Sequence, residues 1–108
     1  MTQSDEERDR SLRERLAEIR RSYIKTLNGH SAELAELARQ AQAGTTGANE
    51  KVMGLVHKIA GTSGSFGIVE IADPAAALEI ALMDDSSSEQ STTGLADLVE
   101  RLSSVTSD

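Results

Sequence analysis

The apolar residues of this chain recur at steps of three and four positions, which is the period of an amphipathic helix. In the first quarter of the chain these positions are Leu12, Leu16, Ile19, Tyr23 and Leu27. Ser4 and Glu7 have the spacing of a capping box, and Asn28 followed by Gly29 is a typical helix stop. We therefore expect a first helix that begins near Ser4 and ends at residues 28–29.

Four further helices follow from the same pattern. Ser31 can cap a second helix, which Gly44 ends. A third helix is expected over about residues 48–66 and a fourth over about residues 69–83. A fifth helix is indicated by apolar residues at Leu95, Leu98, Val99, Leu102 and Val105.

Pro74 leaves the start of the fourth helix open. It either kinks the helix or begins it, with Asp73 as the N-cap. The chain has 14 Ala and 11 Leu but one Tyr, one Phe and no Trp, a composition that favours helices. Because the connections are short, neighbouring helices should run antiparallel. We expect an all-α fold: an antiparallel four-helix bundle with an additional N-terminal helix, in a single stand-alone domain over residues 1–108.

The net charge excludes several classes of function. The chain has 18 acidic and 11 basic residues, for a net charge of −7. Such a balance argues against binding to nucleic acid or to an anionic membrane. The chain has no Cys, no apolar run long enough to span a membrane, and a charged N-terminus where a signal peptide would be apolar. We expect a soluble, cytoplasmic monomer without a bound metal.

Charge is unevenly spread along the chain. Residues 1–25 have a net charge of +1, whereas the remainder has a net charge of −8. In the first segment, arginines alternate with glutamates at the spacing of helical ion pairs, which indicates a solvated helix. Docking of a partner on this helix is the alternative interpretation.

The third predicted helix carries the most informative pattern. On a helical wheel of about 100° per residue, one face holds the apolar stripe Ala48, Val52, Leu55, Ile59, Thr62 and Phe66. His57 stands at the centre of the opposite face, among Glu50, Met53, Gly54, Ala60, Gly61 and Gly64. Each Gly within a helix costs about 0.8–1 kcal/mol relative to Ala. Glycines on the exposed face have no packing role there, so we expect this face to be functional.

An exposed histidine on a face of small residues permits few kinds of chemistry. Its ring offers a nucleophile or a base near neutral pH. No Ser or Cys stands beside it and Glu50 is the only acidic residue on this face, which argues against a hydrolytic triad. Ala60 and Gly61 occupy the positions where a second metal ligand would lie, which argues against a metal site. These absences leave a nucleophilic imidazole that is open to a large partner, which suits transient phosphorylation. His30 lies between two predicted helices and is expected to have no such role.

The segment 57–67 reads HKIAGTSGSFG and resembles the signature of histidine-containing phosphotransfer (HPt) domains. The family pattern is a His, a Gly four residues later, further small residues, and then an apolar residue and a Gly that ends the turn. The matching residues are His57, Gly61, Gly64, Phe66 and Gly67. Many members carry Lys three residues after the His. Ala60 stands there in this chain, and Lys58 is our candidate for steadying the phosphoryl group.

The resemblance covers nearly the whole chain and implies a four-helix bundle that acts in a bacterial multistep phosphorelay. His57 would accept a phosphoryl group from the Asp of one receiver domain and pass it to the Asp of another. The docking surface would comprise Glu50, Met53, Gly54, Ala60, Gly61, Gly64 and Ser65, with Phe66 and Gly67 as structural residues. The partners would be the receiver domains of response regulators or hybrid histidine kinases, and the receiver would bring Mg²⁺.

Two alternatives remain open at the level of the sequence. A bundle of this kind could bind or sequester receiver domains without being phosphorylated. It could also accept phosphate at the ATP site of a kinase, as the N-terminal domains of chemotaxis kinases do. No P-loop or other nucleotide motif is present, so we expect no ATP-binding or kinase activity of its own.

Overall fold

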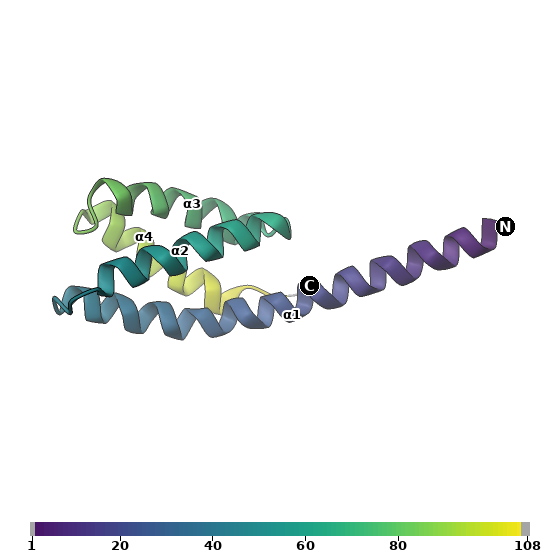
Figure 1. Ribbon diagram of the computed structural model, residues 1–108, viewed down its shortest axis with the longest axis horizontal. Helices are drawn as coiled ribbons and strands as arrows, with labels where there is room; N and C mark the ends of the chain where they lie inside the picture. The colour runs from purple at the N-terminus through teal and green to yellow at the C-terminus, as the bar shows by residue number, and fades with distance from the viewer. Residues whose placement is uncertain (1, 107–108) are drawn as a thin grey trace.

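The computed structural model describes residues 2–106, with side chains from Asp5 onward, as a bundle of helices (Figure 1). The helices are α1 (Thr2–Gln42), α2 (Ala48–Ser65), α3 (Val69–Asp84) and α4 (Glu89–Ser104). The described residues include no strand. The expected all-α bundle is confirmed.

The first and second expected helices are one continuous helix, α1, and the expected break at residues 28–29 is wrong. The side chain of Asn28 has another partner. Its Nδ2 donates hydrogen bonds to the main-chain carbonyls of Leu102, at 2.6 Å, and Val105, at 3.3 Å. These carbonyls lie at the C-terminal end of α4, where a helix leaves its acceptors without intrahelical partners. The residue that resembles a stop signal therefore caps a different helix.

Ser31 is likewise not an N-cap. It lies within α1, and its Oγ donates to the main-chain carbonyl of Val99 at 2.9 Å. At the other end, α1 begins at Thr2, upstream of the expected start at Ser4, whose side chain is outside the described residues. Ser31 and Asn28 therefore both attach α1 to α4.

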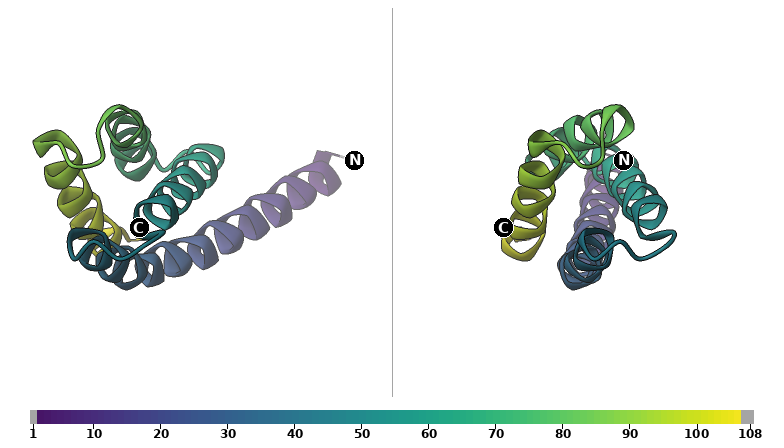
Figure 2. Two further views of the ribbon diagram at one scale, coloured as in Figure 1. Left: turned by 60° about the vertical axis from the view of Figure 1, so that its left-hand side comes forward. Right: turned by 90° about the vertical axis from the view of Figure 1, so that its left-hand side faces the viewer.

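The core lies between α2, α3, α4 and the C-terminal half of α1 (Figure 2). Its fully buried apolar side chains are Leu27, Leu34, Val52, Val56, Ile59, Ile68, Ile71, Leu98 and Leu102. The predicted stripe on α2 agrees in part: Ala48, Val52, Leu55 and Ile59 are buried, whereas Thr62 and Phe66 are half-buried. Burial of this stripe fixes the rotation of α2 about its own axis, and the opposite face is turned to solvent.

α2 ends in a Schellman motif. Gly67 has a φ of +69°, a conformation that a residue with a side chain rarely adopts. The N–H of Ile68 donates to the carbonyl of Ser63 at 2.9 Å, and that of Gly67 to the carbonyl of Gly64 at 3.1 Å. Just before this turn, Phe66 stacks on Tyr23 of α1 with ring centroids 4.9 Å apart. The apolar residue and the Gly that close the 57–67 segment therefore anchor the end of α2.

Pro74 lies inside α3, which begins at Val69, so the alternative start at Asp73 is wrong. A proline has no N–H to donate to the carbonyl four residues earlier, here that of Glu70. Arg101 of α4 donates from Nη1 to this carbonyl at 3.5 Å. The donor that Pro74 lacks is thus replaced by a side chain from the neighbouring helix.

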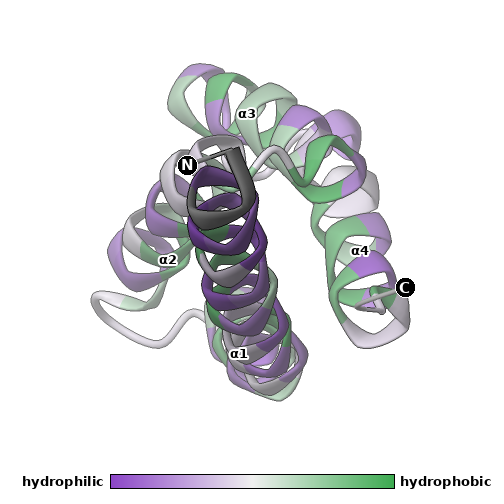
Figure 3. Ribbon diagram, turned by 90° about the vertical axis from the view of Figure 1, so that its right-hand side faces the viewer, coloured by the Kyte–Doolittle hydropathy of each residue, from purple (hydrophilic) through white to green (hydrophobic). Residues whose placement is uncertain are grey.

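The N-terminal part of α1 projects beyond the bundle, and the molecule measures 62 × 22 × 20 Å (Figures 1 and 2). We call residues 2–22 the arm. The side chains of residues 5–19 are all exposed, and the arm is mainly hydrophilic (Figure 3). The solvated helix expected from the charge pattern is therefore present.

Candidate functional site

His57 lies in the middle of α2, on the face that the core leaves free. Its side chain is 77% exposed. Four residues on the opposite side of the helix are buried, so the ring cannot turn inward without unpacking α2. The exposed position predicted from the wheel agrees with the structure.

Glu79 of α3 reaches this ring from the neighbouring helix. Its Oε2 contacts Nδ1 of His57, and its side chain is only 24% exposed. An ionised carboxylate can only accept a hydrogen bond, so Nδ1 of His57 is the donor in this contact, and in the neutral ring Nε2 then keeps its lone pair. The pair therefore presents a nucleophilic nitrogen to solvent.

The expectation that Glu50 is the only acidic residue near His57 is wrong. A helical wheel compares residues of one helix and cannot show a side chain that arrives from another. The sequence does hold a weak signal, because Glu79 follows directly on Leu78 and falls beside the apolar stripe of α3. An acidic residue at the edge of such a stripe often faces a partner across the helix interface.

The glycines around His57 face open solvent. Gly54, Gly61 and Gly64 are exposed, and a Cβ added to any of them would meet no atom within 4 Å. They are therefore not points of close helix packing. The surface beside the imidazole is bare because the sequence places no side chains there.

The other residues predicted for the docking surface fall into two groups. Glu50 and Ser65 are exposed, and Ser65 Oγ donates to the carbonyl of Gly61 at 3.1 Å. Met53 and Ala60 are half-buried and pack against the core. The first group is open to a partner, whereas Met53 and Ala60 form the inner edge of the face.

Lys58 is exposed and lies about 100° around α2 from His57. It stands on the flank away from the half-buried Met53 and Ala60. Among the described residues it forms no ion pair, so its ammonium group is available to an anion bound at His57.

His30, the second histidine, provides an internal comparison. Its Nδ1 also pairs with a glutamate, Glu33, at 2.9 Å, but its side chain is only 15% exposed. The ring lies against the bundle on α1. Of the two histidines, only His57 combines a carboxylate at Nδ1 with a ring that is mostly free.

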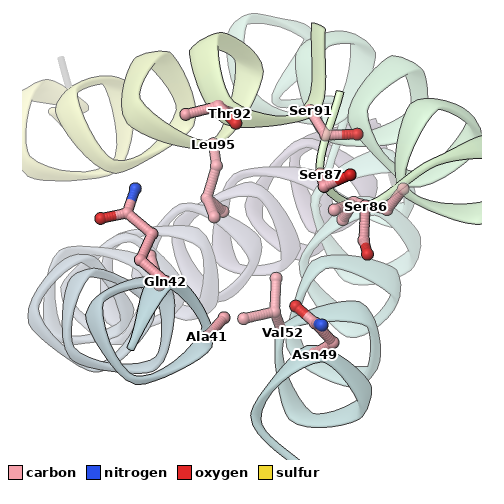
Figure 4. A pocket seen from close by; sticks show the side chains of 11 residues that line it. Ala41, Gln42, Asn49, Val52, Ser86, Ser87, Ser91, Thr92 and Leu95 are labelled. Atoms are coloured by element: carbon pink, nitrogen blue, oxygen red, sulfur yellow. The ribbon is translucent and has the colours of Figure 1, made fainter. Parts of the chain in front are cut away.

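A pocket in the described part of the chain lies away from His57 (Figure 4). It has a volume of about 270 Å³ and is lined by the end of α1, the start of α2 and the α3–α4 connection, with Asn49, Val52 and Leu95 on its walls. Neither His57 nor Glu79 lines it, and it contains no acidic, basic or histidine side chain. The candidate site is therefore an open surface and not a cavity.

Two further features bear on binding. Residues 2–106 include no group of three or more His, Asp and Glu side chains arranged to hold a metal ion. In the same part of the chain, no helix has both the length and the apolar character of a membrane span.

One comparison with known proteins gives a match. The family model described as the Hpt domain matches residues 10–106, which include His57, Glu79 and the whole bundle. Searches among curated proteins and among solved structures found no match. The match spans nearly the full length of the chain, which therefore belongs to the Hpt domain family, whose members carry out histidine phosphotransfer in two-component signalling.

Proposed function

We propose that His57 accepts a phosphoryl group from the aspartyl phosphate of a receiver domain and passes it to the aspartate of a second receiver, in a multistep phosphorelay. One observation carries the proposal: the exposed imidazole of His57 has its Nδ1 on Glu79 and its Nε2 free. His30 lacks that exposure, and neither histidine lines the pocket of about 270 Å³.

The transfer follows from the state of the ring. The lone pair on Nε2 attacks the phosphorus of the aspartyl phosphate, an N–P bond forms, and the P–O bond to the aspartate breaks. The aspartate leaves as a carboxylate, and His57 becomes a phosphoimidazolium that keeps its proton on Nδ1. The carboxylate of Glu79 faces this proton and offsets the new positive charge. No proton has to leave, so the same steps in reverse deliver the phosphoryl group to the next receiver.

The bare face supports docking of a receiver. A folded domain must bring its aspartate within bonding distance of Nε2, and a displacement of about 1 Å can lower a rate about 100-fold. Glu50, Gly54, Gly61, Gly64 and Ser65 leave that approach open, with Met53 and Ala60 at the inner edge. The receiver supplies Mg²⁺, and Lys58 supplies a cation in place of the lysine absent at position 60.

The proposal describes a phosphocarrier of the bacterial cytoplasm. Its partners are receiver domains of response regulators or hybrid histidine kinases. It takes its phosphoryl group from a phosphorylated protein and needs no nucleotide site of its own.

The test is the movement of label from a ³²P-phosphorylated receiver. Wild-type protein should become labelled and should then lose the label to a second, unphosphorylated receiver. His57→Gln should remain folded, because the side chain is exposed, and should take up no label. His30→Gln is the matched control and should behave as wild type. Incubation with Mg²⁺ and labelled ATP alone should leave the protein unlabelled.

Two results would overturn the proposal. Full labelling of His57→Gln would place the acceptor elsewhere. Binding of the receiver by the wild-type protein without any labelling would favour the alternative of a bundle that only sequesters receivers.

A further inference from the structure

The exposed large apolar side chains of the described residues fall on two helical faces and nowhere else. All six are more than half exposed: Leu12, Leu16 and Ile19 on the arm, and Val69, Ile80 and Met83 on α3. Exposed apolar residues that gather on one face of a helix mark a surface for association more often than scattered ones do. Both faces are therefore candidate surfaces for association.

Arginines border the stripe on the arm. At about 100° per residue, Arg13 and Arg20 lie along one edge of the line through Leu12, Leu16 and Ile19, together with Asp9. Arg8 and Arg15 lie along the other edge. In paired helices the residues at these edges set the choice of partner, because they meet the edges of the facing helix.

This distribution of charge disfavours pairing of two arms with each other. If two arms packed stripe to stripe in parallel, opposite edges would meet. If they packed antiparallel, like edges would meet. In the parallel case Arg13 and Arg20 would face the edge of Arg8 and Arg15, and in the antiparallel case Arg15 would approach its own copy, contacts between like charges that are destabilising. Asp9 offsets part of this repulsion in the antiparallel case, because it can face Arg20 of the other arm. An apolar helical face with acidic edges therefore suits the arm better than a second arm does.

α3 of the same chain offers such a face. Its exposed stripe runs from Val69 to Met83 through Ile80. Glu70 and Asp84 lie along one edge of this stripe, Glu79 lies along the other, and Asp73 lies within it. Residues 69–84 contain no Lys, Arg or His. The exposed face of α3 therefore matches the arm in apolar character and is opposite to the arginines of the arm in charge.

The arm cannot reach α3 of its own copy. α1 contacts α2 and α4 but not α3, and the two helices lie on opposite sides of the bundle (Figures 1 and 2). The arm extends away from the bundle, past the end at which α3 begins (Figure 1). It is therefore placed to contact a second molecule.

We propose that two copies of this chain associate reciprocally, with the arm of each packed on the exposed face of α3 of the other. A two-fold axis makes both contacts equivalent and closes the assembly at two copies. One contact joins only three large apolar side chains from each helix, whereas stable interfaces bury about 1,200–2,000 Å². The reciprocal arrangement doubles the surface area that the two copies bury against each other.

The proposed dimer differs from the monomer expected from the sequence. The sequence could not show that the stripe on α3 faces solvent or that the arm carries no other helix. The proposal does not depend on phosphotransfer, so it stands or falls separately from the role of His57.

The test is sedimentation equilibrium of the full chain from micromolar to millimolar concentration. Wild-type protein should follow a monomer–dimer equilibrium. Leu16→Gln with Ile19→Gln on the arm should raise the dimer dissociation constant at least about tenfold, and so should Ile80→Gln with Met83→Gln on α3. All four side chains are exposed, so circular dichroism should show an unchanged fold.

Reversal of charge gives the sharper test. The arm variant Arg13→Glu with Arg20→Glu and the α3 variant Glu70→Lys with Asp84→Lys should each be monomeric alone. An equimolar mixture of the two variants should form dimers, because acidic arms then meet basic α3 faces and basic arms meet acidic ones. Arg10→Glu with Arg21→Glu changes the opposite face of the arm and should associate as wild type.

Three results would overturn the proposal. Wild-type protein could be monomeric at millimolar concentration. The α3 variants could associate as strongly as wild type, which would mean that the arm pairs with something other than α3. The two charge-reversed variants could remain monomeric when mixed.

Discussion

At the scale of single residues, the two histidines carry the same side chain but differ in how far the fold exposes it. Both His57 and His30 have a glutamate at Nδ1, but the side chain of His57 is 77% exposed and that of His30 is 15% exposed. The helical period predicts the exposure of His57. It does not predict Glu79, because that carboxylate comes from a different helix and depends on how α2 and α3 pack.

Glu79→Gln should slow phosphotransfer without moving the site of labelling. An amide carries no charge to offset the phosphoimidazolium and does not hold the hydrogen on Nδ1 as a carboxylate does. Loss of a comparable orienting group lowers metal affinity or activity about 10- to 100-fold at sites where the histidine binds a metal, and we expect an effect of that order here. The rate of label transfer and the ¹⁵N NMR signals of the His57 ring would be measured together.

A matched control is Glu33→Gln, which removes the same kind of partner from His30 and should leave the rate unchanged. Glu79→Asp should restore part of the rate. If Glu79→Gln transfers at the wild-type rate with an unchanged ring tautomer, Glu79 does not position His57.

At the scale of helices, α2 was the element best predicted from the sequence. Its buried residues follow the helical period, and its glycines lie in open solvent as the wheel indicated. α1 shows the opposite case. Asn28 and Gly29 form a local stop signal, but the hydrogen bonds of Asn28 to α4 outweigh it. Such bonds join residues more than 70 positions apart, so no local pattern could reveal them.

Gly54→Leu and Gly61→Leu should each give a more stable protein that transfers more slowly. Leu exceeds Gly in helix propensity by about 0.5–1 kcal/mol, and nothing stands where the new side chain would go. The same side chain obstructs the approach of a receiver to His57. Urea denaturation and the rate of label transfer would be measured on one preparation.

Gly29→Leu is the control for these variants, since Gly29 is also an exposed helical glycine with open space around it but lies on α1. It should gain stability and keep the wild-type rate. Unchanged transfer in both Gly54→Leu and Gly61→Leu would show that the receiver docks elsewhere.

Asn28→Ala should destabilise the bundle by about 1–2 kcal/mol, because it removes two hydrogen bonds to the end of α4 and leaves those carbonyls without a donor. The measurement is the free energy of unfolding in urea. Lys25→Ala, an exposed change nearby on α1, serves as the reference. Equal stability of the two variants would contradict the capping role of Asn28.

At the scale of the whole molecule, the fold class follows from composition and helical period, whereas the surface does not. The charge difference between the first 25 residues and the rest was visible in the sequence. Only the structure shows that Leu12, Leu16 and Ile19 extend past the bundle while Val69, Ile80 and Met83 stay uncovered on α3. The site at His57 likewise depends on three helices, with α2 supplying the ring, α3 the carboxylate and α1 the stacked end of α2.

The central claim is that His57 carries the phosphoryl group on Nε2, with Nδ1 held by Glu79. The most direct measurement is ¹⁵N and ³¹P NMR of histidine-labelled protein after transfer from a phosphorylated receiver. We predict one phosphohistidine, at His57, bonded through Nε2 and protonated at Nδ1, with His30 unmodified. A phosphoryl group on Nδ1 of His57, on His30, or on no histidine at all would contradict this account.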